Sequence, residues 1–271
     1  MPTETATTNS RQALSVILIT YNEAPRLVQT LNAVRWADEI IVVDSGSTDD
    51  TVKLAQSMGA KTLVTDWPGF GVQKNRALAM ATCPWVLSID ADEVLSPELQ
   101  QEIQTWLQSP PPFNAATLPR LSSFCGQTIR HSGWWPDPVL RLFRRDIARF
   151  SDDRVHERVL VDGPVHALRG VLMHESYRDL DQVIHKINQY SYEGARNLAQ
   201  RGKSASLFTA IGHGLWAFFR TYCLRLGFLD GKAGFILAVS NAEGTYYRYL
   251  KLMYLGHQAR SNQDQPERTV K

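Results

Sequence analysis

The feature that most constrains this chain is a short apolar run that ends in a cluster of carboxylates. Residues 85–89 (Trp-Val-Leu-Ser-Ile) have the length and composition of a strand buried on both faces of a parallel sheet. Asp90, Asp92 and Glu93 follow at once, at what would be the carboxyl edge of that sheet, where α/β folds bind ligands. In extended chain Asp90 and Asp92 share a face, and their mutual repulsion favours a bound Mg²⁺ or Mn²⁺. The alternative is a solvated loop that leads into a helix capped by Ser96.

The chain before this stretch alternates strand-like and helix-like segments. The expected strands are residues 14–20, 39–44, 61–65 and 85–89. Helical patterns follow the first three strands, and the third of these helices is expected over residues 72–81. This alternation predicts an α/β fold with an open, doubly wound, mostly parallel sheet. In such a sheet residues 21–23, Asp44 and residues 90–92 all lie at one edge, which favours a functional role for the acidic stretch.

Size and composition fit a globular protein with one large α/β domain and an appendage. The chain has 271 residues, and its net charge of +2 comes without a dense basic block, so nucleic-acid binding is not expected. The three cysteines, Cys83, Cys125 and Cys223, show no metal or redox spacing and fit a reducing cytoplasm. Residues 1–12 are polar, lack the apolar core of a signal peptide, and are expected to form a disordered leader.

Four ordered motifs carry a resemblance to a known family. They are residues 20–23 (Thr-Tyr-Asn-Glu), 42–49 (Val-Val-Asp-Ser-Gly-Ser-Thr-Asp), 74–77 (Lys-Asn-Arg-Ala) and 90–92 (Asp-Ala-Asp). They resemble the successive motifs of family 2 glycosyltransferases, which have the GT-A fold, a Rossmann-like nucleotide-sugar-binding architecture. Residues 90–93, 141–143 (Arg-Leu-Phe), 155–157 (Val-His-Glu) and 229–231 (Leu-Asp-Gly) resemble the bacterial lipopolysaccharide-core enzymes of this family, of β-1,4-glucosyltransferase type.

The resemblance implies a site for the donor nucleotide sugar, with a UDP-sugar favoured. The implied donor residues are Thr20, Tyr21, Asn22, Glu23, Asp44, Ser45, Lys74, Arg76, Asp90, Ala91 and Arg141. Asp44 would bind the base, and Asp90 would reach the ribose or the metal. Asp92 would hold the divalent cation, Mg²⁺ or Mn²⁺, that bridges the two phosphates, and His174 is a candidate second ligand by analogy. The alternatives are a solvated helix face for Lys74 and Arg76, a structural salt bridge for Arg141 and a structural role for His174.

The catalytic base and the acceptor site are expected later in the chain. An inverting transferase needs a base for the proton of the acceptor hydroxyl. Glu157 is the first candidate, Asp153 is the reserve, and His156 could contact the diphosphate or act as the base itself. The family's commoner Glu-Asp pattern is absent here, and a surface charge cluster is the alternative. The candidate acceptor residues are Trp134, Trp135 and Asp137, since tryptophans stack on sugar rings, although they also fill cores.

The C-terminal part reads as helical. The GT-A domain is expected over residues 13–178, a helical region over 179–260 and a flexible tail over 261–271. The apolar stretches 207–219 and 228–239 are too short or too interrupted to span a bilayer, but cations and aromatics surround them. This pattern predicts peripheral contact with the cytoplasmic face of the inner membrane. The alternative is a helical subdomain that packs on the sheet or on a second subunit, and the oligomeric state stays open.

These observations predict an inverting, metal-dependent hexosyltransferase. It would move a sugar from a nucleoside diphosphate sugar to a glycan or lipid-linked acceptor, with lipopolysaccharide core favoured. The alternatives are a transferase acting on polyprenyl phosphate or another cell-envelope glycan, and a non-catalytic membrane protein that binds sugar nucleotides. A haloacid-dehalogenase-like phosphatase, with Asp90 as nucleophile and Asp92 as acid and base, fits poorly because three strands precede this motif.

Overall fold

The computed structural model describes residues 11–108, 112–152 and 157–263, with side chains of the last helix described as far as residue 256. The chain forms two compact units. Met1–Leu121 and Pro136–His174 make the first, which we call the sheet unit, and Ser122–Trp135 and Glu175–Lys271 make the second, which we call the helical unit. The division after His174 lies close to the boundary expected at residue 178, but the inclusion of residues 122–135 in the helical unit was not foreseen.

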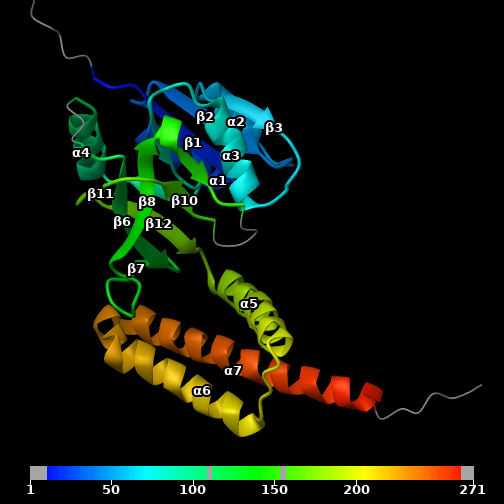
Figure 1. Ribbon diagram of the computed structural model, residues 1–271. Coiled ribbons are helices and arrows are strands. Elements are labelled where there is room, and N and C mark those ends of the chain that lie inside the picture. Colours follow the sequence, from blue (N-terminus) through cyan, green and yellow to red (C-terminus); the bar gives the residue numbers. More distant parts are fainter. Residues whose placement is uncertain (1–10, 109–111, 153–156, 264–271) are drawn as a thin grey trace, which may run out of the picture. The chain divides into compact units, whose positions relative to one another are not determined.

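The first half of the sheet unit is a parallel α/β arrangement. Its strands are β1 (Leu14–Thr20), β2 (Glu39–Asp44), β3 (Lys61–Val64) and β4 (Trp85–Ser88), which lie in the order β3-β2-β1-β4. The helices α1 (Ala24–Ala33), α2 (Thr51–Ser57) and α3 (Phe70–Met80) connect them (Figure 1). All three strand pairs are parallel. The predicted α/β class and the four predicted strands are confirmed.

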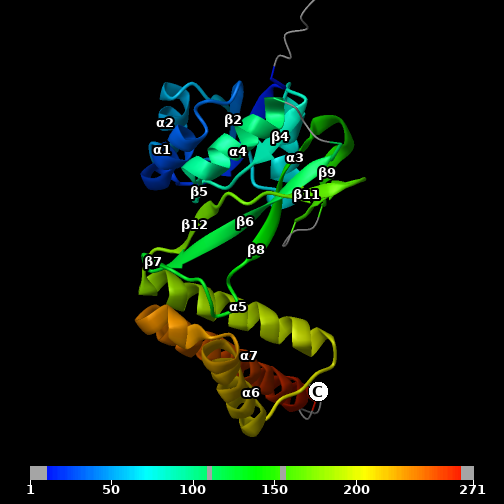
Figure 2. The same ribbon diagram turned by 90° about the vertical axis from the view of Figure 1, so that its left-hand side faces the viewer.

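Antiparallel strands extend the sheet beyond β4, and in the described part of the chain the sheet has ten strands. The order continues β4-β8-β6-β12-β5, with β8 (Asp137–Arg144), β6 (Ala115–Phe124), β12 (Leu172–Tyr177) and β5 (Glu93–Leu95). Figure 2 shows β8 running beside β6. The remaining elements of this region are α4 (Pro97–Gln108), β7 (Gln127–Thr128), η1 (Arg145–Ile147), β9 (Ala148–Phe150), β10 (Val159–Val161) and β11 (Val165–Ala167). β7 and β11 pair with β6, while β9 and β10 form a separate two-stranded sheet.

The central strand β1 is apolar throughout because both of its faces are covered. Val16 and Leu18 lie in one buried cluster with Leu27 and Leu31 of α1. Ile17, one residue out of step, belongs to a second cluster that includes residues of α3. Alternate side chains of a strand point to opposite faces, so a strand covered on both sides needs a continuous apolar run.

The parallel register brings three polar strand ends to one edge. Thr20 lies opposite Asp44 in the β1–β2 pair, and Ile17 lies opposite Ser88 in the β1–β4 pair, so Asp90 follows β4 at the same edge. The hydroxyl of Thr30 on α1 donates a buried hydrogen bond of 2.8 Å to the carbonyl oxygen of Ala91. The acidic stretch is therefore fixed to the first helix as well as to the sheet.

The helical unit contains three long helices. They are α5 (Leu180–Gln200), α6 (Leu207–Phe219) and α7 (Gly231–Gln263), with the short segments η2 (Arg220–Leu224) and η3 (Gly227–Asp230) between α6 and α7. Asp179 caps α5 by accepting from the backbone N–H of Gln182, and Ser206 caps α6 in the same way. α7 packs along both α5 and α6 (Figure 1).

A separate core holds this unit together and explains why residues 122–135 belong to it. Phe124 and Ile129 are buried against Val183 of α5 and against Ala233 and Leu237 of α7. Phe124 at the end of β6 and Ile129 in the following segment thus cover apolar surfaces of α5 and α7 that would otherwise be exposed. No helix in the described part of the chain is long and apolar enough to cross a membrane.

Gly170 provides a test of how β12 is positioned. A methyl group at Gly170 would lie 2.4 Å from Cα and 2.6 Å from the backbone nitrogen of Leu99, which cannot move without shifting α4. We expect Gly170→Ala to lower the free energy of unfolding by about 1–3 kcal/mol, measured by urea denaturation. Gly256→Ala is the matched control, because its added methyl meets nothing within 4 Å. Equal stabilities of the two variants would contradict this account of the packing.

Candidate functional site

A cavity of about 340 Å³ opens at the edge of the sheet where β1 and β4 end. It is lined by Ile19, Thr20, Tyr21, Glu23, Trp67, Phe70, Asp90, Ala91, Asp92 and His174. Six of these residues were predicted from the sequence to bind the donor or the metal: Thr20, Tyr21, Glu23, Asp90, Ala91 and Asp92. His174 was the candidate second metal ligand. The structure therefore brings most of the predicted donor and metal residues to one hollow of the sheet unit.

Asp44 anchors one side of this edge. Its side chain is fully buried, and one carboxylate oxygen accepts hydrogen bonds from the backbone N–H groups of Gly46 and Ser47, at 2.9 and 2.7 Å. The other oxygen accepts from the hydroxyls of Thr20 and Ser47, at 2.8 and 2.5 Å. Asp44 thus fixes the loop that begins with Ser45. If Asp44 binds the nucleotide base, as the resemblance implies, its carboxylate oxygens would accept from the base in addition to the hydrogen bonds they already accept within the chain.

The 21–23 turn interlocks with the same loop. Asn22 has a left-handed backbone (φ 55°), which asparagine tolerates better than most residues. Its backbone N–H donates to the Ser47 hydroxyl at 2.8 Å, and its side-chain oxygen accepts from the N–H of Thr48 at 2.8 Å. The N–H of Glu23 donates to the Thr51 hydroxyl at 2.8 Å. With both ends of the turn held, the Tyr21 side chain is left 57% exposed at the cavity.

Asp90 lies between two cations. Its carboxylate is 2.6 Å from a guanidinium nitrogen of Arg141 on β8 and 3.0 Å from the ammonium of Lys74 on α3. Burial by itself would raise the pKa of Asp90, but the charges of Arg141 and Lys74 and their hydrogen bonds hold that pKa well below its ordinary value. Asp90 is therefore ionised at any pH near neutrality. The structure places the predicted donor residue Arg141 in this ion pair.

Glu93 binds two arginines of this network and the backbone of Asp90. It is fully buried, accepts a 2.6 Å hydrogen bond from Arg141, and accepts the backbone N–H of Asp90 at 3.0 Å. Arg120 on β6 also reaches Glu93, at 3.3 Å, and pairs with Asp137 at 2.6 Å. Burial would lower the pKa of both arginines, but the carboxylates beside them raise it, so both stay charged. Asp137, a predicted acceptor residue, lies in this ion pair.

Lys74 connects Asp90 to Glu157. Only 3% of Lys74 is exposed, and its ammonium is 2.8 Å from the Glu157 carboxylate. The first candidate for the catalytic base is thus joined to the acidic stretch through one buried cation. The other two candidates, Asp153 and His156, lie outside the described residues.

Asp92 faces His174 across the cavity. Nε2 of His174 is 3.6 Å from a carboxylate oxygen of Asp92, and a guanidinium nitrogen of Arg26 is 3.6 Å from the same oxygen. Arg26 is also held at 2.9 Å by Glu23. Two ligands that each stand about 2.1 Å from a small divalent cation are about 3 Å apart when they bind at a right angle. The spacing of Asp92 and His174 is therefore close to that of two ligands of one ion.

In the described part of the chain, carboxylates outnumber cations in this network. The ion pairs found there join the carboxylates of Glu23, Asp90, Asp92, Glu93, Asp137 and Glu157 to the cations Arg26, Lys74, Arg120 and Arg141. Within the described residues no three acidic, histidine or cysteine side chains converge into a ready metal-binding group.

Two other predicted donor residues lie beside the cavity. Arg76 donates to the Asp66 carboxylate at 2.8 Å and to the Thr65 hydroxyl at 3.2 Å, and so holds the loop that precedes α3. Ser45 accepts a 3.0 Å hydrogen bond from the side-chain amide of Gln73. In the structure both residues have partners within the chain, and their contact with a donor remains a prediction.

The predicted acceptor tryptophans belong to the helical unit, whereas Asp137 belongs to the sheet unit. The ring of Trp134 stacks on Tyr177 with the centroids 6.1 Å apart and meets Phe124 edge-on at the same distance. Trp135 has the guanidinium of Arg130 6.0 Å from its ring centroid. Trp134 therefore has the packing role that the sequence left open as the alternative.

Sequence reasoning missed four residues of the site, Arg26, Trp67, Phe70 and Arg120, and it named Glu93 in the acidic cluster without giving it a role. Arg26 follows Glu23 by one helical turn, a spacing that could have indicated the pair. Trp67 and Phe70 form an edge-on pair, 4.8 Å between centroids, and both remain more than 40% exposed at the cavity. Exposed aromatics beside a glycine turn were a usable signal. The partners of Glu93 and Arg120 come from strands that are distant in the sequence, and no local sequence pattern predicts these pairs.

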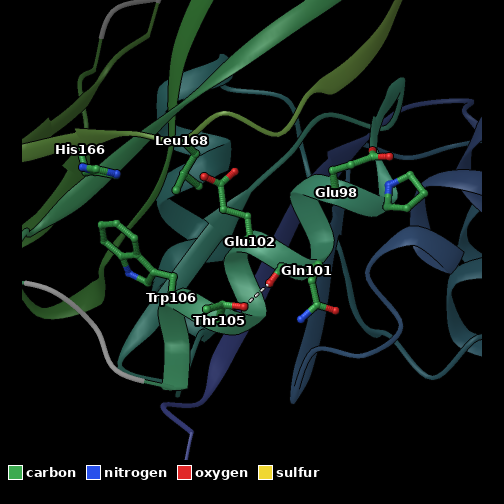
Figure 3. Close-up of a pocket in the computed structure, with 8 residues that line it drawn as sticks. Glu98, Gln101, Glu102, Thr105, Trp106, His166 and Leu168 are labelled. Carbon is green, nitrogen blue, oxygen red and sulfur yellow. Dashed lines mark hydrogen bonds between the residues drawn. The ribbon is translucent and has the colours of Figure 1, made fainter.

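A second hollow of the sheet unit, about 830 Å³, lies between α4 and β11 (Figure 3). Trp106 and His166 face each other there with ring centroids 5.3 Å apart. The carboxylate of Glu102 accepts the backbone N–H groups of Arg169 and Gly170, at 3.0 and 2.7 Å. Glu102 is therefore a structural anchor, and the reactive groups of this unit gather at the acidic edge.

Comparison with known proteins identifies the family. The model of glycosyl transferase family 2 matches residues 15–159, which is more than half of the chain and includes the acidic edge. The chain belongs to glycosyl transferase family 2. An uncharacterized glycosyltransferase of Rickettsia typhi is 33% identical over 260 residues, covering 92% of this chain and 89% of that protein. The lipopolysaccharide core biosynthesis glycosyltransferase LpsC of Rhizobium meliloti is 30% identical over 255 residues, covering 87% and 93%.

Two solved structures are similar to this chain at low sequence identity. Glucosyl-3-phosphoglycerate synthase from Mycobacterium tuberculosis, in complex with Mn²⁺, UDP and glucosyl-3-phosphoglycerate, matches 64% of this chain and 75% of that chain, with 21% identity and a TM-score of 0.45. S. aureus TarS matches 91% and 92%, with 17% identity and a TM-score of 0.43. The family match and the sheet order confirm the predicted family and the GT-A class of fold.

The depressed pKa of Asp90 predicts how stability depends on pH. An aspartate titrates near pH 3.9 in the unfolded chain and at a lower pH in the folded protein. Its stabilising contribution is therefore complete above about pH 5 and is lost as the pH falls toward the folded pKa. The stability difference between wild type and Asp90→Asn should be constant from about pH 5 to pH 7 and should shrink by about pH 3, measured by urea unfolding.

The control for this experiment is Asp50→Asn, because Asp50 is exposed and, among the described residues, its ion pair is with the exposed Lys53, at 3.1 Å. Its effect on stability should be small at every pH. A difference between wild type and Asp90→Asn that does not change with pH would contradict the ion pairing assigned to Asp90.

Proposed function

We propose that this protein is an inverting glycosyltransferase that takes a hexose from a nucleoside diphosphate sugar, with UDP favoured, and transfers it to a glycan or lipid-linked acceptor. The observation that carries the proposal is the placement of Asp92 opposite His174, beside the ion-paired Asp90, in a cavity at the carboxyl edge of a parallel sheet. Lipopolysaccharide core is the favoured acceptor, and the name of the Rhizobium meliloti relative supports it.

A divalent cation, Mg²⁺ or Mn²⁺, fits the residues present. Asp92 and His174 offer two ligands at a suitable spacing, and carboxylates outnumber cations among the described residues around them. Such ions complete their shells with water and with substrate phosphates rather than with a full protein cage, in keeping with the absence of a third converging ligand in the described residues. The bound ion would offset the charge that develops on the leaving diphosphate.

The chain's own residues would bind and orient the donor. The exposed rings of Tyr21, Trp67 and Phe70 border the cavity and could stack on the flat base. Asp90, held ionised between Arg141 and Lys74, could accept a hydrogen bond from a ribose hydroxyl. Because these cations are themselves fixed by Glu93 and Glu157, the carboxylate would be oriented before the donor arrives.

Glu157 is the proposed base. The acceptor oxygen would attack the anomeric carbon from the face opposite the diphosphate, and the bond from that carbon to the diphosphate oxygen would break. The hydroxyl proton would pass to the Glu157 carboxylate, so the product has the inverted configuration. The ion pair with the buried Lys74 would position Glu157 for this step.

The family match speaks against the phosphatase alternative. The model of glycosyl transferase family 2 covers residues 15–159, so Asp90 and Asp92 lie within a glycosyltransferase domain. A protein that only binds sugar nucleotides remains the second candidate, because its site would keep the same residues. Turnover of a nucleotide sugar by the wild-type protein distinguishes the transferase from this non-catalytic alternative.

The helical unit would bring the protein to a lipid surface. Exposed apolar side chains gather on α6, with Phe208 84% and Leu215 68% exposed. Phe219 at the end of α6 is exposed as well, and further exposed apolar residues follow the helix: Leu224, Leu226, Phe228, Leu229 and Phe235. The cations Arg220, Arg225 and Lys232 lie in the same stretch of chain. Apolar and aromatic side chains next to cations favour an interface with anionic lipid, which would place a lipid-linked acceptor within reach at the cytoplasmic face of the inner membrane.

The metal assignment is tested on donor binding. Asp92→Ala and His174→Ala each remove one proposed ligand, so each should weaken UDP binding in Mn²⁺ by about tenfold or more and leave the weaker metal-free binding unchanged. Isothermal titration with and without Mn²⁺ measures both. Asp162→Ala, an exposed carboxylate of the sheet unit, is the control and should behave as wild type. Full Mn²⁺ dependence in both ligand variants would rule out this metal site.

The base is tested on turnover. Glu157→Gln should keep donor binding but lower kcat at least about 100-fold, because a general base contributes that much or more. Asp152→Asn, which changes an exposed carboxylate in the same segment, should leave kcat unchanged. An unaltered kcat in Glu157→Gln would move the base to another residue, and no turnover in the wild type with any nucleotide sugar would favour the non-catalytic alternative.

The membrane contact is tested on vesicles. Fully burying a leucine or phenylalanine side chain is worth about 1.5–3 kcal/mol, so Phe208→Ser with Leu215→Ser should weaken sedimentation with phosphatidylglycerol-containing vesicles at least about tenfold. The control double variant is Val64→Ser with Ile147→Ser, which removes two exposed apolar side chains of the sheet unit. Equal sedimentation of the two double variants would show that α6 is not the contact.

A further inference from the structure

The helical unit contains a cavity that the proposed transfer reaction does not use. Its volume is about 430 Å³, and residues of α5, α6, η2, α7 and the 132–134 loop line it. Figure 1 shows α7 lying along α5 and along α6. Three arginines contribute to the lining: Arg220 at the end of α6, Arg225 after η2 and Arg248 on α7. The cavity therefore gathers three guanidinium groups from separate positions of one unit.

Among the residues that the structure describes, these arginines have no acidic partner. No aspartate or glutamate of that part of the chain lines the cavity. Within the described residues, none of the three guanidinium groups has an ion pair or a side-chain hydrogen bond. The remaining polar lining is neutral and includes Ser132, Ser191, Thr221, Ser240, Asn241 and Thr245. The hydroxyl protons of Ser132 and Ser191 are donated to Asp230 and to the carbonyl oxygen of Asn188, which leaves Thr221, Ser240, Asn241 and Thr245 as groups that can donate to a ligand. In the described part of the chain the cavity thus combines hydrogen-bond donors with three guanidinium groups that have no ion pair.

Two glycines make room for the arginine side chains. A methyl group on Gly194 of α5 would lie 2.7 Å from Nε and 3.0 Å from Cδ of Arg248. A methyl group on Gly133 would lie 2.6 Å from both Cδ and Nη1 of Arg225, and Gly133 has a left-handed backbone as well (φ 79°). The two side chains lie against bare backbone at these glycines, and both arginines are exposed to solvent.

Asp230 fixes the loop that forms one wall. Its carboxylate accepts the backbone N–H groups of Arg130 and His131, at 3.0 Å each, and the hydroxyl of Ser132 at 2.9 Å. The ring of His131 contacts the same carboxylate at 3.1 Å. Asp230 is almost fully buried and its oxygens are used by this loop, so it holds the wall rigid. The aromatic residues Trp134, Tyr177 and Tyr190 complete the lining.

We propose that this cavity binds a phosphate group carried by a sugar or by a lipid headgroup. Guanidinium groups bind phosphate through paired N–H donors, and hydroxyl groups can donate to the remaining oxygens. A volume of 430 Å³ exceeds what a single phosphate fills, and the aromatic walls offer flat surfaces for an attached sugar or glycerol. The site is separate from the donor cavity of the sheet unit and does not depend on the reaction proposed for it.

The first test compares phosphate-bearing probes with neutral ones on the full chain. The probes are glucose 6-phosphate against glucose, by isothermal titration, and phosphatidic acid in phosphatidylcholine vesicles against phosphatidylcholine alone, by sedimentation. Binding of glucose 6-phosphate alone identifies a soluble phosphosugar as the source of the phosphate, and binding of phosphatidic acid alone identifies a lipid headgroup. Binding no stronger to either phosphate than to its neutral partner would overturn the proposal.

The second test locates the binding. Arg220→Gln with Arg248→Gln should weaken the phosphate-dependent binding at least about tenfold, since two charge-assisted contacts are lost. Arg201→Gln with Lys203→Gln removes the same charge from exposed positions outside the cavity and should leave it within about twofold. This comparison also accounts for phosphate that binds the donor cavity, which neither double variant alters. Equal losses in the two double variants, or none in either, would overturn the assignment.

The third test separates a built site from net charge. Gly194→Ala keeps every charge but displaces the Arg248 side chain, so the phosphate-dependent binding should fall several-fold. Gly212→Ala, whose methyl on α6 meets nothing within 4 Å, is the matched control and should bind as wild type. Both substitutions put alanine in a helix, which favours folding, and a melting curve of each checks it. Unchanged binding in Gly194→Ala would contradict a site shaped around Arg248.

Discussion

The sheet unit depends on neutralising the carboxylates that follow β4. Asp90 and Glu93 sit where a buried strand meets the cavity, and a carboxylate removed from water is costly unless a cation and hydrogen bonds meet it. Arg141 lies 2.6 Å from both carboxylates. Lys74 pairs with Asp90, and Arg120 pairs with Glu93. These three cations come from β8, α3 and β6. The antiparallel strands beside β4 thus have a role beyond packing, because they deliver the charges that keep the acidic edge folded.

The three carboxylates of this stretch differ in their partners. Asp90 and Glu93 are bound by buried cations, whereas Asp92 lines the cavity and, within the described residues, pairs with Arg26 and His174 at the longer distance of 3.6 Å. The inner carboxylates hold the edge in shape, and the outer one is the carboxylate to which we assign the proposed cation.

The sequence predicted the parallel half of the sheet and the acidic edge because both depend on local patterns. Apolar runs of strand length and the residues that end them are visible in the chain, and β1 and β2 begin and end where the pattern placed them. The partners of the acidic residues were beyond local patterns, since Glu93 meets Arg120 and Arg141 only after β6 and β8 have paired in order. For the same reason residues 122–135 could not be assigned to the helical unit, because their apolar side chains are buried by helices that begin more than fifty residues later. Asp230 was visible as part of a motif, but its loop-anchoring role required the fold.

The most direct test of the central claim is a crystal structure of the protein with UDP and Mn²⁺, with the manganese located by its anomalous signal. The account predicts one manganese bound by Asp92 and His174 and bridging the two phosphates, with the base beside Tyr21 and the ribose near Asp90. A diphosphate bound at this edge without manganese, or a manganese held by other residues, would contradict the account.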